Sequence, residues 1–206
     1  MASLRNLSDY TWNMANFSQT LQVFLSSKKP KTLQDLIDNF AEKSFAILFL
    51  LLMAIPALPL PTGGVTHVFE IIVMLLSLEL IAGRKTVWLP KQWTNKKLPN
   101  KLQTSALPKL LRSVRWVEGH SKPRLSRLLV NVVSTRILAL TILFFTIFAF
   151  LAPPFSGLDT LPSLGVVIIA LAIIFEDFLL TVIGIAVGIA GIGLVLLLGQ
   201  LVIQVL

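Results

Sequence analysis

The sequence predicts an all-α integral membrane protein with two tandem repeats, each an amphipathic helix followed by a broken helical hairpin, and an extra apolar helix at the C-terminus. Of its 206 residues, 55% are hydrophobic and only 14% are charged, and the mean hydropathy is +0.81. This composition is too apolar for a soluble domain. Clusters of proline and glycine interrupt the apolar runs twice, which predicts the broken hairpins. The apolar runs cover residues 45–60, 68–82, 137–152, 164–175 and 178–206.

The two breaks resemble each other. A shift of 94 positions places four residues of the first break on four of the second: Pro59 on Pro153, Thr62 on Ser156, Gly63 on Gly157 and Thr66 on Thr160. Proline removes a backbone donor and stops a helix, so neither break continues a helix. Duplicated broken helices are typical of transporters, whose repeats are often inverted and whose sites lie where the repeats meet. A gene duplication without transport is the alternative.

The chain is expected to divide into five segments. These are an N-terminal amphipathic surface helix at residues 1–31, the first repeat at 32–83, a basic linker at 84–122, the second repeat at 123–177, and the C-terminal apolar segment at 178–206. Residues 1–31 have apolar side chains at three- and four-residue spacing, typical of a helix at the membrane interface. Packing of this helix on the hairpins is an equal alternative.

The apolar runs of the hairpins are short for a membrane crossing. At about 1.5 Å per residue they reach about 18 to 24 Å, against a hydrocarbon core of roughly 30 Å, so re-entrant hairpins are expected. The last run would extend for about 43 Å, which suits one tilted span or two short legs. Its small residues Gly184, Ala186, Gly188 and Ala190 allow the close approach of another helix, either from this chain or from a second copy in a homodimer.

Positive charge is concentrated in the linker. Thirteen of the 18 Lys and Arg residues lie between Arg84 and Arg136, and none follows Arg136. The positive-inside tendency therefore places the linker and the N-terminal segment in the cytoplasm, with both breaks at the midplane or the far side. Membrane lipids are the expected partner of these charges, and no nucleic acid is needed to explain them.

Residues 83–90, Gly-Arg-Lys-Thr-Val-Trp-Leu-Pro, together with the doubled breaks and the acidic pair Glu176 and Asp177, resemble the ExoD family, which is named for exopolysaccharide synthesis. The resemblance covers about residues 33–198. It implies a small multi-pass protein of the bacterial inner membrane that is linked to exopolysaccharide production. Glu79 stands where many relatives are expected to have Gln, which weakens any mechanism that needs a charge there.

The residues required for most enzyme chemistry are missing. The chain has no cysteine, and its two histidines, His67 and His120, are far apart in sequence. It also has no phosphate-binding glycine loop and no acidic pair placed to hold the metal of a sugar nucleotide. The sequence therefore predicts a non-catalytic protein with no metal site and no cofactor.

Acidic residues in or near the apolar segments are the candidates for function, because each costs roughly 2.5 to 3.5 kcal/mol at the membrane centre. Together with the residues of the breaks they give the expected substrate-binding set: Pro59, Thr62, Gly63, Gly64, His67, Glu70, Glu79, Ser156, Gly157, Asp159, Glu176 and Asp177. For Glu176 and Asp177, pairing with the basic linker is the structural alternative.

Glu70 is the strongest single candidate. It shares a helix face with His67, Met74 and Ser77, whereas Glu79 is nine positions away and points to the opposite side. Carboxylates without nearby Lys or Arg favour a cationic solute or a proton. We therefore expect a small secondary transporter or channel for a cation such as arginine or lysine, with proton coupling as an option. The alternative is a non-transporting accessory or structural subunit in exopolysaccharide synthesis or export.

Overall fold

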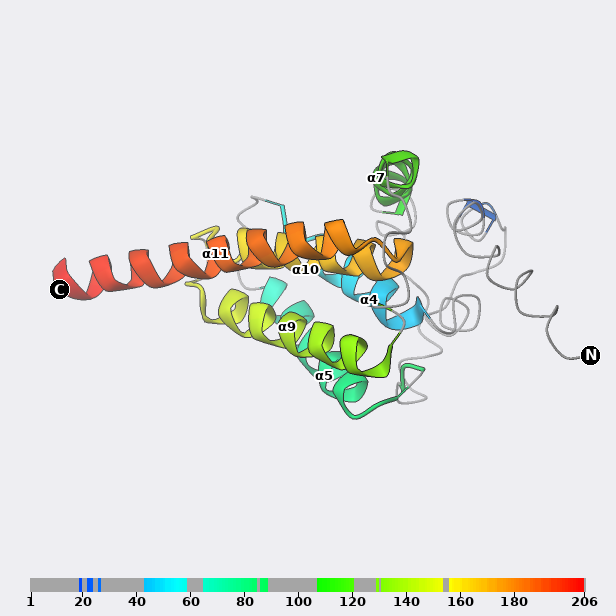
Figure 1. Cartoon of the computed structure of the whole chain (residues 1–206). Helices are drawn as coiled ribbons and strands as arrows, with labels where there is room; N and C mark the ends of the chain where they lie inside the picture. The colour runs from blue at the N-terminus through cyan, green and yellow to red at the C-terminus, as the bar shows by residue number, and fades with distance from the viewer. Residues whose placement is uncertain are drawn as a thin grey trace, which may run out of the picture. The chain divides into compact units, whose positions relative to one another are not determined.

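The computed structural model describes residues 19, 22–23, 26, 43–58, 65–84, 86–88, 107–120, 129, 131–153 and 156–205. Its helices are α4 (Ser44–Met53), α5 (Val65–Ile81), α7 (Leu107–His120), α9 (Val132–Leu151), α10 (Thr160–Phe175) and α11 (Phe178–Val205) (Figure 1). None of the described residues lies in a strand. The all-helical prediction is therefore confirmed for this part of the chain.

The chain forms two compact units. One contains Met1–Asp38 and Leu89–Lys122, and the other contains Asn39–Trp88 and Pro123–Leu206 and is called the helical bundle below. In the first unit, α7 is amphipathic, since Val114 is buried while Arg112 and Arg115 are exposed. Arg115 also donates a hydrogen bond to the side chain of Gln22.

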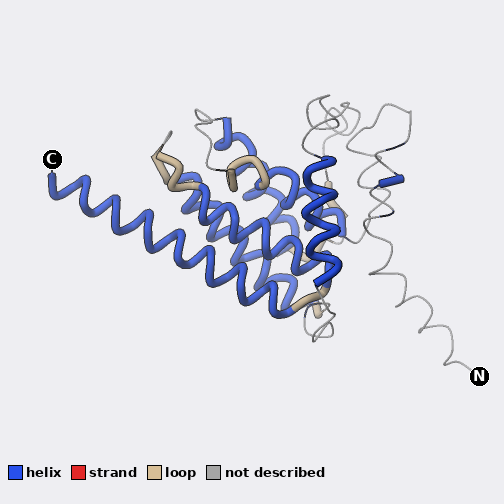
Figure 2. The backbone as a smooth tube through the Cα atoms, turned by 90° about the horizontal axis from the view of Figure 1, so that it is seen from above, coloured by secondary structure: helices blue, strands red, loops and turns tan. Residues whose placement is uncertain are grey.

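The helical bundle consists of α4, α5, α9, α10 and α11. Helix α10 packs against α11 along much of its length, and it also packs against α4 and α9, while α5 packs mainly against α9. The last turns of α11 extend beyond the other helices of the bundle in both views (Figures 1 and 2). The segment after residue 178, for which one helix or two legs were expected, forms the single helix α11.

Helices α10 and α11 come into backbone contact at glycines. A Cβ atom added to Gly165 would lie 2.7 Å from the Cα atom of Gly188, and one added to Gly184 would lie 3.0 Å from the backbone nitrogen of Ile169. On α11, the small residues Gly184 and Gly188 therefore face their own chain. Ala186 and Ala190, by contrast, are exposed.

The surface of the helical bundle is apolar and several of its buried side chains are polar. Large exposed apolar side chains line α5, α9 and α11, including Leu75, Leu140 and Leu197. The buried polar residues are Ser44, Thr66, Glu70, Ser77, Thr146, Ser163, Asp177 and Thr181. A soluble protein buries polar groups less readily than it exposes them, so this pattern fits a lipid environment. Two stretches, Val132–Leu151 and Phe178–Leu198, are long and apolar enough to cross a membrane.

Both breaks separate helices. Helix α4 ends at Met53 and α5 begins at Val65, while α9 ends at Leu151 and α10 begins at Thr160. In the second break, Gly157 has a φ of +68°, a conformation that favours glycine. Four predicted site residues, Pro59, Thr62, Gly63 and Gly64, lie outside the described residues. So do most of the N-terminal segment, residues 32–42 at the start of the first repeat, most of residues 123–130 at the start of the second, and residues 85, 89–106 and 121–122 of the linker.

Candidate functional site

The first half of the site lies in the first turns of α5. His67 and Glu70 are three residues apart and therefore share a face of the helix. Their side chains meet at 2.8 Å, between His67 Nδ1 and Glu70 Oε2. The Glu70 side chain is 0% exposed, and its second oxygen, Oε1, is buried without a hydrogen-bond partner. Glu70 thus has one satisfied oxygen and one that lacks a donor.

Asp159 brings the second break to the same place. It lies directly before α10, at the N-cap position, but its side chain does not cap the helix. Its carboxylate is hydrogen-bonded to Thr66 and lies within electrostatic range of His67 and Glu70. Burial raises the pKa of Asp159 above its ordinary value, although its hydrogen bonds and His67 act in the other direction. We call Thr66, His67, Glu70 and Asp159 the carboxylate cluster.

Two buried hydroxyl groups in the first turn of α10 also lack a partner. They are Thr160 Oγ1 and Ser163 Oγ. Ser163 lies one turn after Asp159, on the same face of the helix, and its backbone N–H donates to the Asp159 carbonyl at 3.1 Å. The buried hydroxyls of Ser77 and Thr146 instead donate to the carbonyl four residues earlier, at 2.8 and 2.7 Å. We call Thr160 and Ser163 the hydroxyl pair.

The carboxylate cluster is partly open to its surroundings. The His67 side chain is 25% exposed, and Asp159 is partly exposed as well. The His67 ring contacts the ring of Phe150, near the end of α9, with 5.0 Å between centroids. The cluster therefore lies at the end of the helical bundle where both breaks occur. His67 and Asp159 are thus more accessible than Glu70, which is fully buried.

Glu79 belongs to a different environment at the other end of α5. Its Oε2 atom accepts a hydrogen bond from the backbone N–H of Trp88 at 3.0 Å. The chain reaches this position by a turn at Gly83, with φ +87°, after which the Arg84 guanidinium lies 5.5 Å from the centre of the Trp88 ring. Val87 is buried. Residues 83–84 and 86–88 thus fold back onto the end of α5, where the Trp88 amide is held by Glu79.

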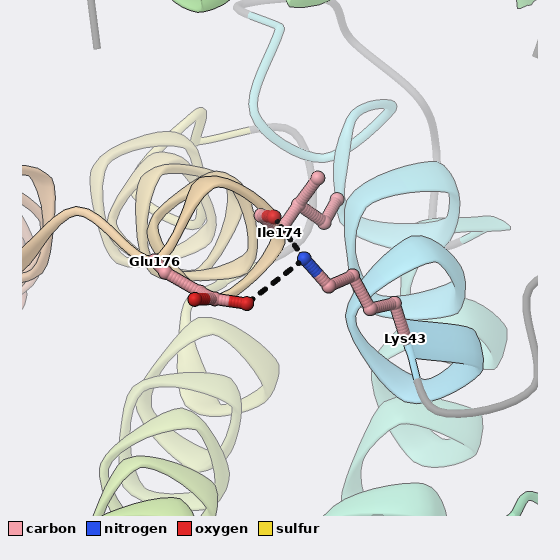
Figure 3. A network of polar contacts seen from close by, with 3 residues as sticks. All are labelled: Lys43, Ile174 and Glu176. Carbon is pink, nitrogen blue, oxygen red and sulfur yellow. Dashed lines mark hydrogen bonds and ion pairs between the residues drawn. The ribbon is translucent and has the colours of Figure 1, made fainter. Parts of the chain in front are cut away.

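Glu176 and Asp177 form the connection between α10 and α11. Lys43 donates a hydrogen bond to the Ile174 carbonyl at 2.6 Å and forms an ion pair with Glu176 Oε1 at 3.3 Å (Figure 3). Asp177 Oδ1 accepts from the backbone N–H of Leu179 at 3.0 Å, as an N-cap does. The cation beside Glu176 therefore comes from the residue before α4, and not from the basic linker named in the structural alternative.

The structure brings together three of the predicted site residues, His67, Glu70 and Asp159. Ser156 and Gly157 lie in the second break, where the Ser156 hydroxyl donates to the Pro153 carbonyl at 2.6 Å. Glu79, Glu176 and Asp177 lie elsewhere, in the contacts given above.

Three polar residues of this region were missed as site residues. They are Thr66, Thr160 and Ser163. Thr66 and Thr160 occupy equivalent positions in the two breaks, which was a usable signal. Among the residues that the structure describes, no group of three or more His, Cys, Asp or Glu side chains could hold a metal ion.

Comparison with known proteins identifies the family. A sequence model of the family described as "Exopolysaccharide synthesis, ExoD" matches residues 17–197. The chain belongs to the ExoD family. This confirms the resemblance inferred from the sequence. The family's printed description links it to exopolysaccharide synthesis but assigns no role to any residue.

Two relatives have sequences that align with most of the chain. An uncharacterized protein of Synechocystis sp. is 26% identical over 171 residues, which is 82% of this chain and 80% of the relative. The Protein ExoD of Rhizobium meliloti is 27% identical over 170 residues, which is 80% of this chain and 70% of that protein. No solved structure matches the chain.

Proposed function

We propose that this ExoD-family chain is a non-catalytic membrane component that supports exopolysaccharide synthesis or export. The observation that carries the proposal is the family match over residues 17–197. The apolar surface of the helical bundle and its two helices long enough to cross a membrane support a place beside membrane-bound enzymes. The absence of cysteine and the scarcity of histidine support a role without catalysis.

The direct test is deletion of the gene in its native host, followed by measurement of secreted polysaccharide. We expect secretion to fall and to recover when the wild-type chain is supplied again. Unchanged secretion would overturn the proposed role. Purified chain incubated with sugar nucleotides should transfer no sugar, and transfer by the pure chain would overturn the non-catalytic part.

A second candidate function is secondary transport of a cation, such as a basic amino acid. The carboxylate cluster favours it, because Glu70 is a fully buried carboxylate with an oxygen that has no partner. A buried polar group without a partner is costly, and such groups mark functional sites in membrane proteins. The site lies at the breaks, where transporter folds bind their substrates.

The packing of the helices also supports an arrangement of two related halves. The shift of 94 positions maps residues 44–53 of α4 into α9 and residues 65–81 of α5 onto residues 159–175, which contain α10. The shift thus pairs α4 with α9 and α5 with α10. In the structure α4 packs on α10, and α9 packs on α5. Two repeats related by a two-fold axis would pack in this way, because the first helix of each repeat would contact the second helix of the other. Such pairs of repeats are a feature of transporters.

Transport is tested with purified chain in liposomes and radiolabelled arginine or lysine. We expect uptake above that of empty liposomes, with a large loss in Glu70→Gln. The matched control is Glu79→Gln, on the same helix but outside the carboxylate cluster. Absence of uptake would remove transport of basic amino acids while leaving the role in exopolysaccharide synthesis untouched.

A homodimer is also part of the proposal. On α11 the exposed small residues Ala186 and Ala190 would let a second copy approach closely. The mass of the purified chain in detergent, measured by light scattering, should be that of two copies. A monomer mass would overturn this part.

A further inference from the structure

The starting point is a charge that the protein leaves incompletely compensated. Glu70 is fully buried, and His67 contacts only one of its two oxygens. Asp159 is a second acid that interacts electrostatically with Glu70. Among the described residues, no Lys or Arg forms an ion pair with either acid. The described cations of the helical bundle lie elsewhere, with Lys43 on Glu176 and Arg136 beside Gly83.

The unused acceptors around Glu70 have the chemistry of a cation site. The Ser163 side chain is 0% exposed, and its hydroxyl has no partner, which is rare for a buried polar group. Ser163 shares a helix face with Asp159, and Asp159 interacts with Thr66 at the start of α5. The unpartnered hydroxyls of α10 therefore lie within one turn of Asp159, which itself interacts with Thr66, His67 and Glu70 of α5.

We propose that Glu70, Asp159 and the hydroxyl pair bind one monovalent cation, either an inorganic ion such as Na⁺ or ammonium, or the ammonium head of an organic solute. Oxygen ligands are the ones that such cations prefer.

The charge of the site favours a monovalent cation. Two carboxylates exclude an anion. The helices α5 and α10 both begin at the site, and the partial positive charge of their N-termini offsets part of the carboxylate charge. A single positive charge therefore balances the site better than two would.

The inference deepens the transport candidate but does not depend on it, because a bound cation can also serve a structural role. Binding is therefore measured without any flux, on the purified full chain in detergent. Thermal unfolding is followed while NaCl, ammonium chloride, methylammonium chloride or lysine is increased, with choline chloride holding the ionic strength constant. Sodium and ammonium test for an inorganic ion, and methylammonium and lysine test for an ammonium head group.

A cation that binds only the folded chain raises the unfolding temperature in a saturable way. We expect this rise with at least one of the four salts, its absence in Glu70→Gln, and its full retention in Glu79→Gln. Ser163→Ala should change two measured quantities in opposite directions, the stability without cation and the cation affinity. It removes an unpartnered buried hydroxyl, so the variant should be more stable than the wild type without cation and should bind the cation about tenfold more weakly.

Several results would overturn the inference. These are no saturable rise with any of the salts, or a normal rise in Glu70→Gln. If Glu70→Gln does not fold, Ser163→Ala and Asp159→Asn decide, and unchanged cation affinity in both rejects the site. Binding in the wild type combined with no uptake in liposomes would retain the site and reject transport.

Discussion

The acids of the helical bundle differ in what compensates each one. Glu79 accepts a hydrogen bond from the Trp88 backbone N–H, and Asp177 accepts one from the first turn of α11. Glu176 forms an ion pair with Lys43. Among the acids that the structure describes, only Glu70 keeps a buried carboxylate oxygen without a partner. The acids that stabilise turns and helix ends are therefore separated from the one that has capacity for a ligand.

Lys43 stabilises the end of α10, and its removal should lower the stability of the bundle. Lys43→Met leaves the Ile174 carbonyl and the Glu176 carboxylate without their cation. Hydrogen bonds to charged groups contribute about 1.5 to 3 kcal/mol, and the loss should be of this order because both side chains are largely buried. The measurement is thermal unfolding in detergent. Lys43→Arg should retain most of the stability, and equal stability of all three proteins would refute the role.

The raised pKa of Asp159 predicts a pH dependence of cation binding. Burial makes the charged form costly, so Asp159 loses its proton at a higher pH than an ordinary aspartate. Without cation, the chain should lose stability as the pH rises through this pKa, because the carboxyl ionises more readily when unfolded. Cation affinity should rise over the same interval, since the proton and the cation compete.

Cation titrations at several pH values test this dependence, with Asp159→Asn as the comparison. The other titratable groups of the site are His67 and Glu70 on α5. Helix α4 contributes no titratable side chain, and α9 contributes Arg136, which lies beside Gly83 at the opposite end of α5. An Asp159→Asn curve identical to that of the wild type would assign the pH dependence to His67 or Glu70.

At the scale of helices, the packing of α11 against α9 and α10 depends on glycine. A Cβ atom at Gly188 would lie 2.0 Å from the ring of Phe145, whereas one at Gly193 would meet nothing within 4 Å. Gly188→Ala should therefore destabilise the bundle by about 1 to 3 kcal/mol, because the helices must move apart. Gly193→Ala, on the same helix, should be neutral or stabilising by up to about 1 kcal/mol, since alanine favours helix. Equal unfolding temperatures of the two variants would contradict the packing.

The sequence was sufficient to predict the helices and the breaks, because apolar runs and prolines act locally. It also placed His67 and Glu70 on one face, since helical spacing determines that relation. It could not predict which cation pairs with Glu176, because Lys43 is 133 residues away in sequence. For the same reason it could not predict that Asp159 interacts with Glu70 and His67, which depends on tertiary packing. Small residues on α11 predicted a close contact but not which of them would face α10.

At the scale of the whole bundle, the described positive charges and the carboxylate cluster lie at opposite ends of the helices. Lys43, at the start of α4, contacts the end of α10, and Arg136, near the start of α9, lies beside Gly83 at the end of α5. The carboxylate cluster is at the other ends of α5, α9 and α10. The positive-inside tendency therefore predicts that the end with Lys43, Arg84 and Arg136 faces the cytoplasm.

This polarity predicts the side from which the second break can be reached. Helix α9 has 20 residues and so extends for about 30 Å, the thickness of the hydrocarbon core. If it starts at the cytoplasmic interface near Arg136, it ends at the far interface, and the exposed Ser156 lies there. The chain has no cysteine, so Ser156→Cys and Arg112→Cys each introduce a single reactive thiol.

In intact cells, a membrane-impermeant thiol reagent should label Ser156→Cys and leave Arg112→Cys, in the basic linker, unlabelled until the membrane is opened. Labelling of Arg112→Cys alone in intact cells would invert the orientation. Protection of both thiols until the membrane is opened would place the second break at or inside the cytoplasmic half, which would mean that α9 does not cross. A cation would then reach the carboxylate cluster from the cytoplasm, whereas the labelling expected here gives it access from the opposite side.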